Sequence, residues 1–229
     1  MTWPLALLSL VLASAFPLHT RAASQQGGAD PQVSPDLYAG LKWRNIGPFH
    51  GGRIASVTGV IGQVGVFYAG TPQGGIWKTT SAGVTWYPIF DQVTEVDGIG
   101  AIQVAPSDPN VIYAGSGDSV GGSDGDGMYK STDAGKTWTH IGLEDTTRIN
   151  KMVVDPKDPN IVLASTTGDA TRQGGGVYRT TDGGRTWQNV LKPEGFSGTR
   201  DLEYEFDMPA VMFATTQGTG AGFGGAAAG

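Results

Sequence analysis

The sequence predicts an all-β protein, a β-propeller of four-stranded blades in which the ring is incomplete and about three to four blades are present. An octet with the pattern Ser/Thr-x-Asp-x-Gly-x-Thr-Trp recurs at residues 131–138 and 180–187, with a weaker copy at 79–86. A second predicted hairpin precedes each of the two later octets, so each unit has four short strands. Four-stranded units that repeat about every 40–50 residues are typical of propeller blades.

Each octet has the composition of a hairpin tip between two short strand-like runs. Gly135 and Gly184 can adopt a positive φ, which a loop of roughly four or five residues requires. Asp133 and Asp182 lie two residues earlier, where a carboxylate can accept hydrogen bonds from turn N–H groups. We therefore expect a structural role for the octet residues Ser131, Asp133, Gly135, Thr137, Trp138, Thr180, Asp182, Gly184, Thr186 and Trp187. Ser81 replaces the aspartate in the first copy, so that turn should be the weakest.

The second hairpin of the unit carries an Asp-Pro-Asn turn. Residues 102–113 match residues 152–163, and a fainter copy spans 202–213 with its turn at 207–210. The tryptophans at positions 43, 86, 138 and 187 are separated by 43, 52 and 49 residues. The whole four-stranded unit, and not the octet alone, is therefore the repeat.

Composition excludes several classes of function. The net charge of −6 argues against a nucleic-acid partner, because phosphate binding needs a basic surface. The absence of cysteine excludes disulfides, thiol chemistry and thiolate metal sites. The three histidines lack the spacing of a zinc site, so we expect neither a metal nor a cofactor.

Residues 1–23 have the features of a secretory signal peptide. An apolar, uncharged run covers residues 3–18, and Ala-Ser-Ala at 13–15 provides a cleavage site. No Lys or Arg precedes that run, which leaves an uncleaved anchor as the alternative. Residues 24–40 are polar and read as a disordered linker. The expected location is periplasmic or extracellular, with no stable membrane span after cleavage.

The predicted propeller spans residues 41–216 and is followed by a Gly/Ala-rich tail at 217–229. Residues 42–47 resemble the outermost strand at 137–142, although no partner strands precede them. We expect them to form the outermost strand of a blade whose other strands come from the opposite end of the ring; we call residues 42–47 the lent strand. A fragment of a longer protein, a natural short domain with a flexible tail, and a partner chain that completes the ring are the alternatives. Open sheet edges should favour aggregation or oligomerisation.

The octets resemble Asp-boxes, also called bacterial neuraminidase repeats, which occur in sialidases, sortilin-like receptors, xyloglucanases and a photosystem II assembly factor. The run at 43–53, together with the Asp-Pro-Asn turns, is most similar to large secreted bacterial proteins described as glycosyl hydrolases or sortilin N-terminal domain-containing proteins. The resemblance covers about residues 40–220. It implies a propeller fold and leaves the activity open, because such folds host unrelated functions.

The resemblance to xyloglucanases can be tested at one catalytic position. The run that holds a catalytic aspartate in that family corresponds to residues 68–75 here, and Pro72 occupies the catalytic position. A glycosidase of that type needs two carboxyl groups, and the second would lie in blades absent from this chain. A sialidase would need an arginine cluster, and the spacing of Arg44, Arg53 and Arg148 does not assemble one. Arg53 is expected to be the first residue of a strand.

Strand parity places the octets and the Asp-Pro-Asn turns on one face of the propeller. The opposite face carries the loops at 71–75, 91–98, 116–126, 143–148, 166–176 and 192–197. Acidic residues outnumber basic ones there, which favours cationic or hydroxyl-rich ligands. The candidate ligand-binding residues on this face are Glu95, Asp97, Asp118, Asp126, Arg148 and Arg172. Asp118, Asp124 and Asp126 are interpreted as part of a solvated loop, with a calcium loop as the alternative, because the EF-hand pattern is absent.

Three functions remain open at this point. The first is a secreted or periplasmic module that binds or assembles a protein, peptide or glycan ligand. The second is a carbohydrate-active enzyme whose catalytic residues lie largely outside this chain. The third is a structural subunit of a larger assembly. The residues favour a non-catalytic role for this chain and leave catalysis by a longer protein open.

Overall fold

The computed structural model describes residues 34, 40, 52–118, 124–169, 171–204 and 212–218. All fourteen strands in these residues belong to the second of the two units into which the chain divides, Phe49–Gly229. The expected signal peptide, most of the expected linker, the lent strand at 42–47, the turn at 207–210 and most of the tail lie outside the described residues.

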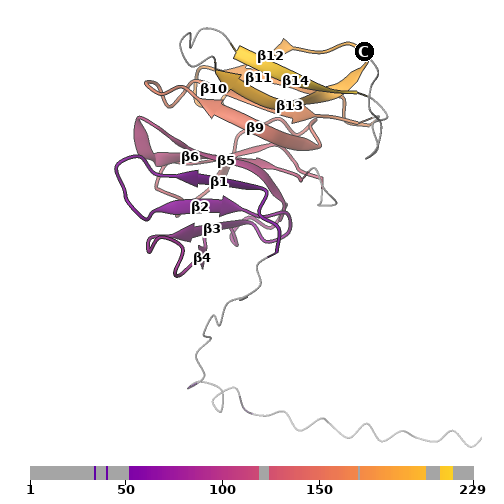
Figure 1. The fold of residues 1–229 in the computed structure, drawn as a ribbon. Helices are drawn as coiled ribbons and strands as arrows, with labels where there is room; N and C mark the ends of the chain where they lie inside the picture. The colour runs from indigo at the N-terminus through magenta and orange to yellow at the C-terminus, as the bar shows by residue number, and fades with distance from the viewer. Residues whose placement is uncertain are drawn as a thin grey trace, which may run out of the picture. The chain divides into compact units, whose positions relative to one another are not determined.

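The described part of the second unit contains fourteen strands and no helix, and all strand pairs are antiparallel (Figure 1). The first sheet consists in order of β1 (Ser56–Gly59), β2 (Phe67–Gly70), β3 (Ile76–Thr79) and β4 (Tyr87–Pro88). The second consists of β5 (Ile99–Ala105), β6 (Asp108–Ser116), β7 (Met128–Ser131) and β8 (Thr139–His140). We call these sheets blade 1 and blade 2.

The third sheet joins one complete blade to half of the next. Blade 3 consists of β9 (Arg148–Val154), β10 (Val162–Thr167), β11 (Gly176–Thr180) and β12 (Gln188–Leu191). Blade 4 is the hairpin of β13 (Phe196–Tyr204) and β14 (Met212–Gly218). The two blades form one six-stranded sheet, because β10 pairs with β13 through a single residue pair, Thr167 with Gly198. The architecture confirms the predicted all-β propeller of four-stranded blades, with an incomplete last unit.

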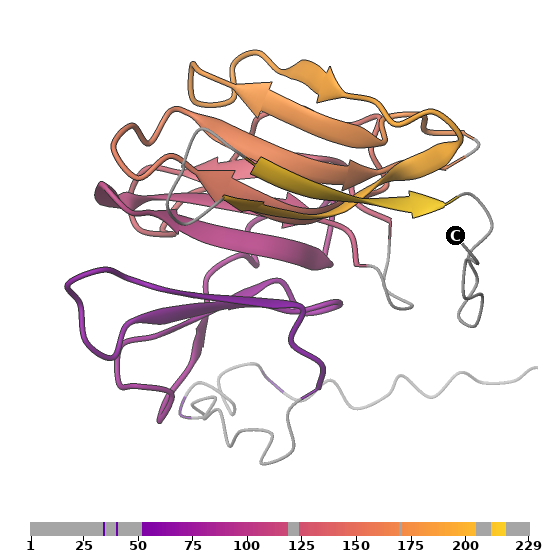
Figure 2. The ribbon, with the colours of Figure 1, turned by 45° about the horizontal axis from the view of Figure 1, so that its top comes forward.

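The blades follow one another in chain order, and their first strands lie next to each other (Figure 2). β1 contacts β5, β5 contacts β9, and β9 contacts β13. Three apolar clusters fill the successive interfaces, centred on Tyr68 and Phe90 between blades 1 and 2, on Tyr113 and Met152 between blades 2 and 3, and on Leu202 between blades 3 and 4. The third cluster is the smallest because blade 4 contributes only a hairpin in the described residues.

At the first two interfaces, a glycine of the second strand lies very close to an isoleucine of the next blade's first strand. A Cβ on Gly70 would lie 2.6 Å from Ile99 Cγ2, and one on Gly115 would lie 2.3 Å from Ile149 Cβ. These glycines therefore make room for the isoleucine of the next blade. At the third interface Ser165 and Thr199 replace the glycine and the isoleucine, and their hydroxyls are 2.9 Å apart in a buried hydrogen bond.

The octets close their turns with a repeated hydrogen-bond set. Asp133 Oδ1 accepts hydrogen bonds from Thr137 N at 2.9 Å and Ser131 Oγ at 2.8 Å, while its Oδ2 accepts from Thr137 Oγ1 at 2.7 Å. Asp182 repeats these bonds with Thr186 and Thr180. In the first copy, Ser81 Oγ accepts only one backbone hydrogen bond, from Thr85 N at 2.9 Å. Gly135 and Gly184 have φ values of 86° and 93°, in the left-handed region.

The octet tryptophans connect neighbouring blades. Trp138 Nε1 donates to Ile89 O of blade 1 at 2.8 Å, and Trp187 Nε1 donates to Ile141 O of blade 2 at 2.7 Å. Both acceptors lie next to the outermost strand of the preceding blade. Trp86 differs, because its Nε1 donates to Gly83 O of its own turn at 3.1 Å.

Lysines complete the connection from the opposite direction. Lys78 Nζ donates to Ala134 O at 3.1 Å, and Lys130 Nζ donates to Gly183 O at 3.2 Å. Each acceptor belongs to the octet of the following blade. The Nζ atoms also lie 5.1 and 5.2 Å from the ring centroids of Tyr68 and Tyr113. We call this pair of reciprocal hydrogen bonds, tryptophan backward and lysine forward, the blade latch.

Candidate functional site

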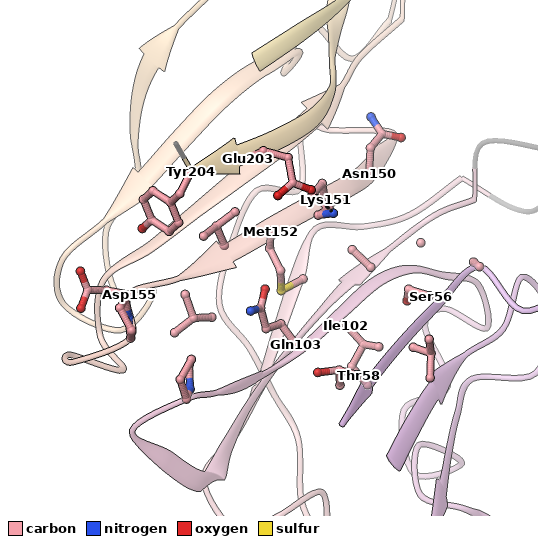
Figure 3. Close-up of a pocket in the computed structure, with 18 of the residues that line it drawn as sticks. Ser56, Thr58, Ile102, Gln103, Asn150, Lys151, Met152, Asp155, Glu203 and Tyr204 are labelled. Atoms are coloured by element: carbon pink, nitrogen blue, oxygen red, sulfur yellow. Dashed lines mark hydrogen bonds and ion pairs between the residues drawn. The ribbon is translucent and has the colours of Figure 1, made fainter. Parts of the chain in front are cut away.

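A groove with a volume of about 890 Å³ runs along the first strands of all four blades (Figure 3). Its walls come from β1, β5, β9 and β13, which are the inner strands of a propeller. Polar side chains are spread along it, namely Ser56, Thr58, Gln103, Asn150, Lys151 and Glu203. The groove therefore offers hydroxyl, amide and charged groups on a rigid sheet scaffold.

Lys151 carries the main ion pair of the groove. Its Nζ lies 2.9 Å from Glu203 Oε1 and 3.6 Å from Asp201 Oδ1, so it connects blade 3 to blade 4. The hydrogen bond to Glu203 raises the pKa of the Lys151 ammonium, which keeps the pair charged. Lys151 and Glu203 line the groove, and their side chains are 42% and 65% exposed, so a ligand in the groove can reach them.

One end of the groove opens into a second cavity of about 430 Å³, which we call the channel mouth. It is lined by Arg53, Ile54, Ala55, Pro72, Gly100, Asp118, Asn150 and Arg200. Ala55, Gly100 and Asn150 also line the groove, so the two spaces adjoin. The mouth lies on the face that carries the loops between second and third strands, where the sequence predicts a site.

β-bulges place several mouth residues. The strand register shifts between Ile99 and Ala101 in β5, between Ile149 and Lys151 in β9, and between Thr199 and Asp201 in β13. The extra residue in each case is Gly100, Asn150 or Arg200. A bulge leaves its extra residue out of the ladder and redirects it, and bulges are common next to active sites.

An ion pair joins two walls of the mouth. Arg53 Nη2 lies 2.8 Å from Asp118 Oδ2, and the side chains are 48% and 6% exposed. Arg53 lies before β1, which begins at Ser56, so the expectation that it is the first residue of a strand is wrong. It neutralises a nearly buried carboxylate across the mouth. Asn150 Nδ2 donates to Thr167 Oγ1 at 2.6 Å and to Thr199 O at 2.8 Å, which fixes its amide against blades 3 and 4.

Of the six predicted ligand-binding residues, Asp118 lies in the channel mouth. Asp126 lies further out, where Oδ2 accepts a hydrogen bond from Tyr129 OH at 2.7 Å. Glu95 accepts from Thr94 N at 3.0 Å, and Asp97 O accepts from Gly75 N at 2.8 Å. These three residues are engaged in the loop face without lining either cavity.

The two predicted arginines also lie in the loop face. Arg172 donates to the backbone carbonyls of Gly125 and Thr146, which joins the loops of blades 2 and 3. Arg148 begins β9, and its Nε is buried without a hydrogen-bond partner in the described part of the chain. Neither arginine lines the groove or the mouth.

Sequence reasoning missed Asn150, Lys151, Arg200 and Glu203 as site residues. They lie within strands, whereas the sequence predicts a site in the loops. A signal was present, since Gly100, Asn150 and Arg200 are spaced by the repeat and follow equivalent positions in three blades.

In the described ranges, no three His, Cys, Asp or Glu side chains gather into a group able to hold a metal ion. Within the same ranges, no helix is long and apolar enough to cross a bilayer.

The fold and the groove define an Asp-box β-propeller module. The family model Sortilin-Vps10, described as sortilin, neurotensin receptor 3, matches residues 74–194, which is more than half of the chain. The chain belongs to this family.

Xyloglucanases and their structural relatives are similar to the chain. A xyloglucanase from a Paenibacillus species is 30% identical over 137 residues, covering 52% of this chain and 13% of the relative. The GH74 xyloglucanase from Xanthomonas campestris superposes with a TM-score of 0.58 at 18% identity, covering 73% of this chain and 28% of that one. A GH74 enzyme from Niastella koreensis gives a TM-score of 0.54 at 25% identity, covering 70% and 24%. The chain thus spans about an eighth of the curated relative and about a quarter of the solved ones.

Proposed function

We propose that this chain is a ligand-binding propeller module that holds a protein, peptide or glycan in the groove along its inner strands. The observation that carries the proposal is the groove itself, a space of about 890 Å³ bounded by four successive blades and adjoining the channel mouth. Concave sites that gather polar groups on a rigid scaffold are the usual place for ligand binding.

Two features support a binding role over hydrolysis by this chain. Pro72, which corresponds to a catalytic aspartate in xyloglucanases, lines the channel mouth. The one carboxylate among the mouth-lining residues, Asp118, is paired with Arg53. A glycosidase needs one carboxyl group as acid and a second as base or nucleophile. A carbohydrate-active enzyme remains the second candidate for a longer protein, because the similar xyloglucanases act on a polysaccharide.

We further propose that the module works in the periplasm or outside the cell. The basis is the signal-like sequence at residues 1–23. Cell fractionation of the native host, with detection by an antibody against the propeller, tests this location. Recovery of the mature chain from the cytoplasm alone would contradict it.

Binding should be tested on the purified chain against a glycan array and a peptide array. Gln103→Trp should abolish the binding, because Gln103 lies in the groove and an indole would fill the space. Gln188→Trp on β12 is the matched control, since Gln188 is exposed on a strand that does not line the groove. Ligand binding that Gln103→Trp leaves intact, or an array with no ligand for the folded chain, would overturn the proposal.

A further inference from the structure

We propose that the channel mouth recognises a carboxylate-bearing sugar, so that the ligand is an acidic polysaccharide such as a polyuronate. This inference rests on the proposed ligand-binding function and narrows its ligand class. The mouth combines a cationic group, an amide oxygen that can accept a hydrogen bond from a hydroxyl group, and a continuation into a polar groove.

The shape of the mouth depends on the three bulges. A Cβ on Gly100 would lie 2.2 Å from Gly117 O and 2.6 Å from Ile149 O, so only glycine fits that bulge. Asn150 and Arg200 occupy the corresponding bulges of the next two blades. One glycine and two polar side chains therefore line the same cavity from successive inner strands. Because the three bulges are equivalent, the cavity has space next to the glycine of blade 2 and polar side chains from blades 3 and 4.

The charges of the mouth leave a net positive group for an anion. Arg53 and Asp118 neutralise each other through their contact at 2.8 Å. Arg200 is exposed, and no ion pair joins it to another described residue. A guanidinium presents a fork of N–H donors that matches the two oxygens of a carboxylate. Arg200 is therefore the group expected to bind the sugar carboxylate.

The carboxylates of the surrounding loops keep their negative charge and accept hydrogen bonds within those loops. Asp169 accepts hydrogen bonds from Thr171 and Arg172, and Asp126 accepts from Tyr129 and Ser116. Neither aspartate lines the mouth. The acidic count of the whole face is therefore a poor guide to the potential inside the cavity.

Hydroxyl recognition distinguishes a sugar acid from a peptide carboxylate. Asn150 Nδ2 is used by Thr167 and Thr199, so the amide offers its Oδ1 as an acceptor to a ligand. A sugar hydroxyl can donate to this oxygen, whereas a peptide C-terminus carries no hydroxyl groups. The hydroxyl and amide groups of Ser56, Thr58 and Gln103 continue this surface along the groove.

The test uses isothermal titration calorimetry with the whole chain and three probes. The probes are hexagalacturonate, its methyl ester, and a hexapeptide with a free C-terminal carboxylate. We expect hexagalacturonate to bind and the uncharged ester to bind at least about tenfold more weakly. Added salt should lower the affinity for hexagalacturonate and leave the affinity for the ester unchanged. The peptide should not compete.

Variants locate the charge. Arg200→Gln should weaken hexagalacturonate binding about tenfold or more and leave the binding of the methyl ester unchanged. Arg179→Gln is the matched control, since Arg179 is exposed on β11 and lines neither cavity. Equal melting temperatures of the two variants establish that both are folded. The salt dependence of the unmodified chain gives a second reading that needs no variant.

Several results would overturn the inference. These are equal affinity for the acid and its ester, a salt-independent affinity, an Arg200→Gln variant that binds like the parent, or preferential binding of the peptide. If the chain binds a neutral glycan or a peptide in the groove but does not bind hexagalacturonate, this inference is wrong and the proposed function stands. If the folded chain binds no member of either array, both fail.

Discussion

The octet aspartates act as acceptors at the centre of each turn, and their protonation should open the turn. Asp133 accepts hydrogen bonds from the hydroxyl and the backbone N–H of Thr137, and these bonds, chiefly the one from the hydroxyl, lower its pKa to about 2. The pKa of Asp182 is lowered as well, chiefly by the hydroxyl of Thr186. The unfolded value for aspartate is about 3.9. The stabilisation is therefore complete above about pH 4 and is lost as the pH falls toward 2.

Asp133→Asn should reduce the acid sensitivity of the fold, because asparagine does not titrate. We expect lower stability than the parent at pH 7 and a smaller further loss between pH 4 and pH 2. Urea unfolding midpoints at pH 7, 4 and 2.5 measure both effects. A variant whose midpoint falls with pH as steeply as that of the parent would contradict this role.

The first octet provides the converse experiment. Ser81 holds the aspartate position with a single backbone hydrogen bond from Thr85 N. Ser81→Asp adds an acceptor that can also reach the Thr85 hydroxyl, which now lies 2.9 Å from Ser81 Oγ. We expect a gain of about 0.5–1.5 kcal/mol in the free energy of unfolding at pH 7, which disappears at acid pH. Ser81→Asn, which cannot ionise, is the control.

The octet hydrogen bonds could be predicted from sequence, whereas the latch and the channel mouth could not. Asp133 and its partners lie within a span of about seven residues, so local turn chemistry is enough to place them. Trp138 and Ile89 are 49 residues apart, and Arg53 and Asp118 are 65 apart. Such partners depend on how neighbouring blades pack, which no local pattern encodes. The mouth also depends on bulges, and a bulge shifts the strand parity on which the sequence argument relied.

At the scale of the element, the blade latch explains why tryptophan ends each octet. The indole packs beside the interface cluster and also carries an N–H that reaches the preceding blade. Lysine returns a hydrogen bond to the octet of the following blade. The turn is thus both the end of one hairpin and a joint between blades.

Trp187→Phe should destabilise the protein more than Trp86→Phe. Phenylalanine keeps much of the ring packing, and it removes the bond to Ile141 O in one case and the bond within the turn to Gly83 O in the other. Because Trp187→Phe removes a hydrogen bond between blades, it should lower the free energy of unfolding by about 1 kcal/mol more than Trp86→Phe does. Urea denaturation measures the difference. Equal losses in the two variants would show that the inter-blade bond is not stabilising.

The small residue of the second strand is a further requirement of the interface. Gly115→Ala would place a methyl group 2.3 Å from Ile149 Cβ, so the two blades must move apart. We expect a loss of about 1–3 kcal/mol. Gly52→Ala is the control, because a Cβ there meets no atom within 4 Å. A Gly115→Ala variant as stable as the control would argue against the close approach.

At the scale of the whole molecule, stability and function both arise between blades. Each apolar cluster is shared by two neighbours, so no blade buries its core alone. The groove likewise belongs to no single blade, since four inner strands supply its walls. The ends of the described array expose apolar side chains, Val57 and Val84 on or near blade 1 and Phe213 on blade 4. A conservative change inside one blade can therefore alter the groove through its neighbour.

The measurement that tests the succession of latched blades most directly is an isotope-edited nuclear Overhauser experiment on the indole protons, assigned with single Trp→Phe variants. The account predicts contacts from the Trp138 indole proton to Ile89, from that of Trp187 to Ile141 and Gly142, and from that of Trp86 to Gly83. Contacts of Trp138 and Trp187 confined to their own octets would contradict it.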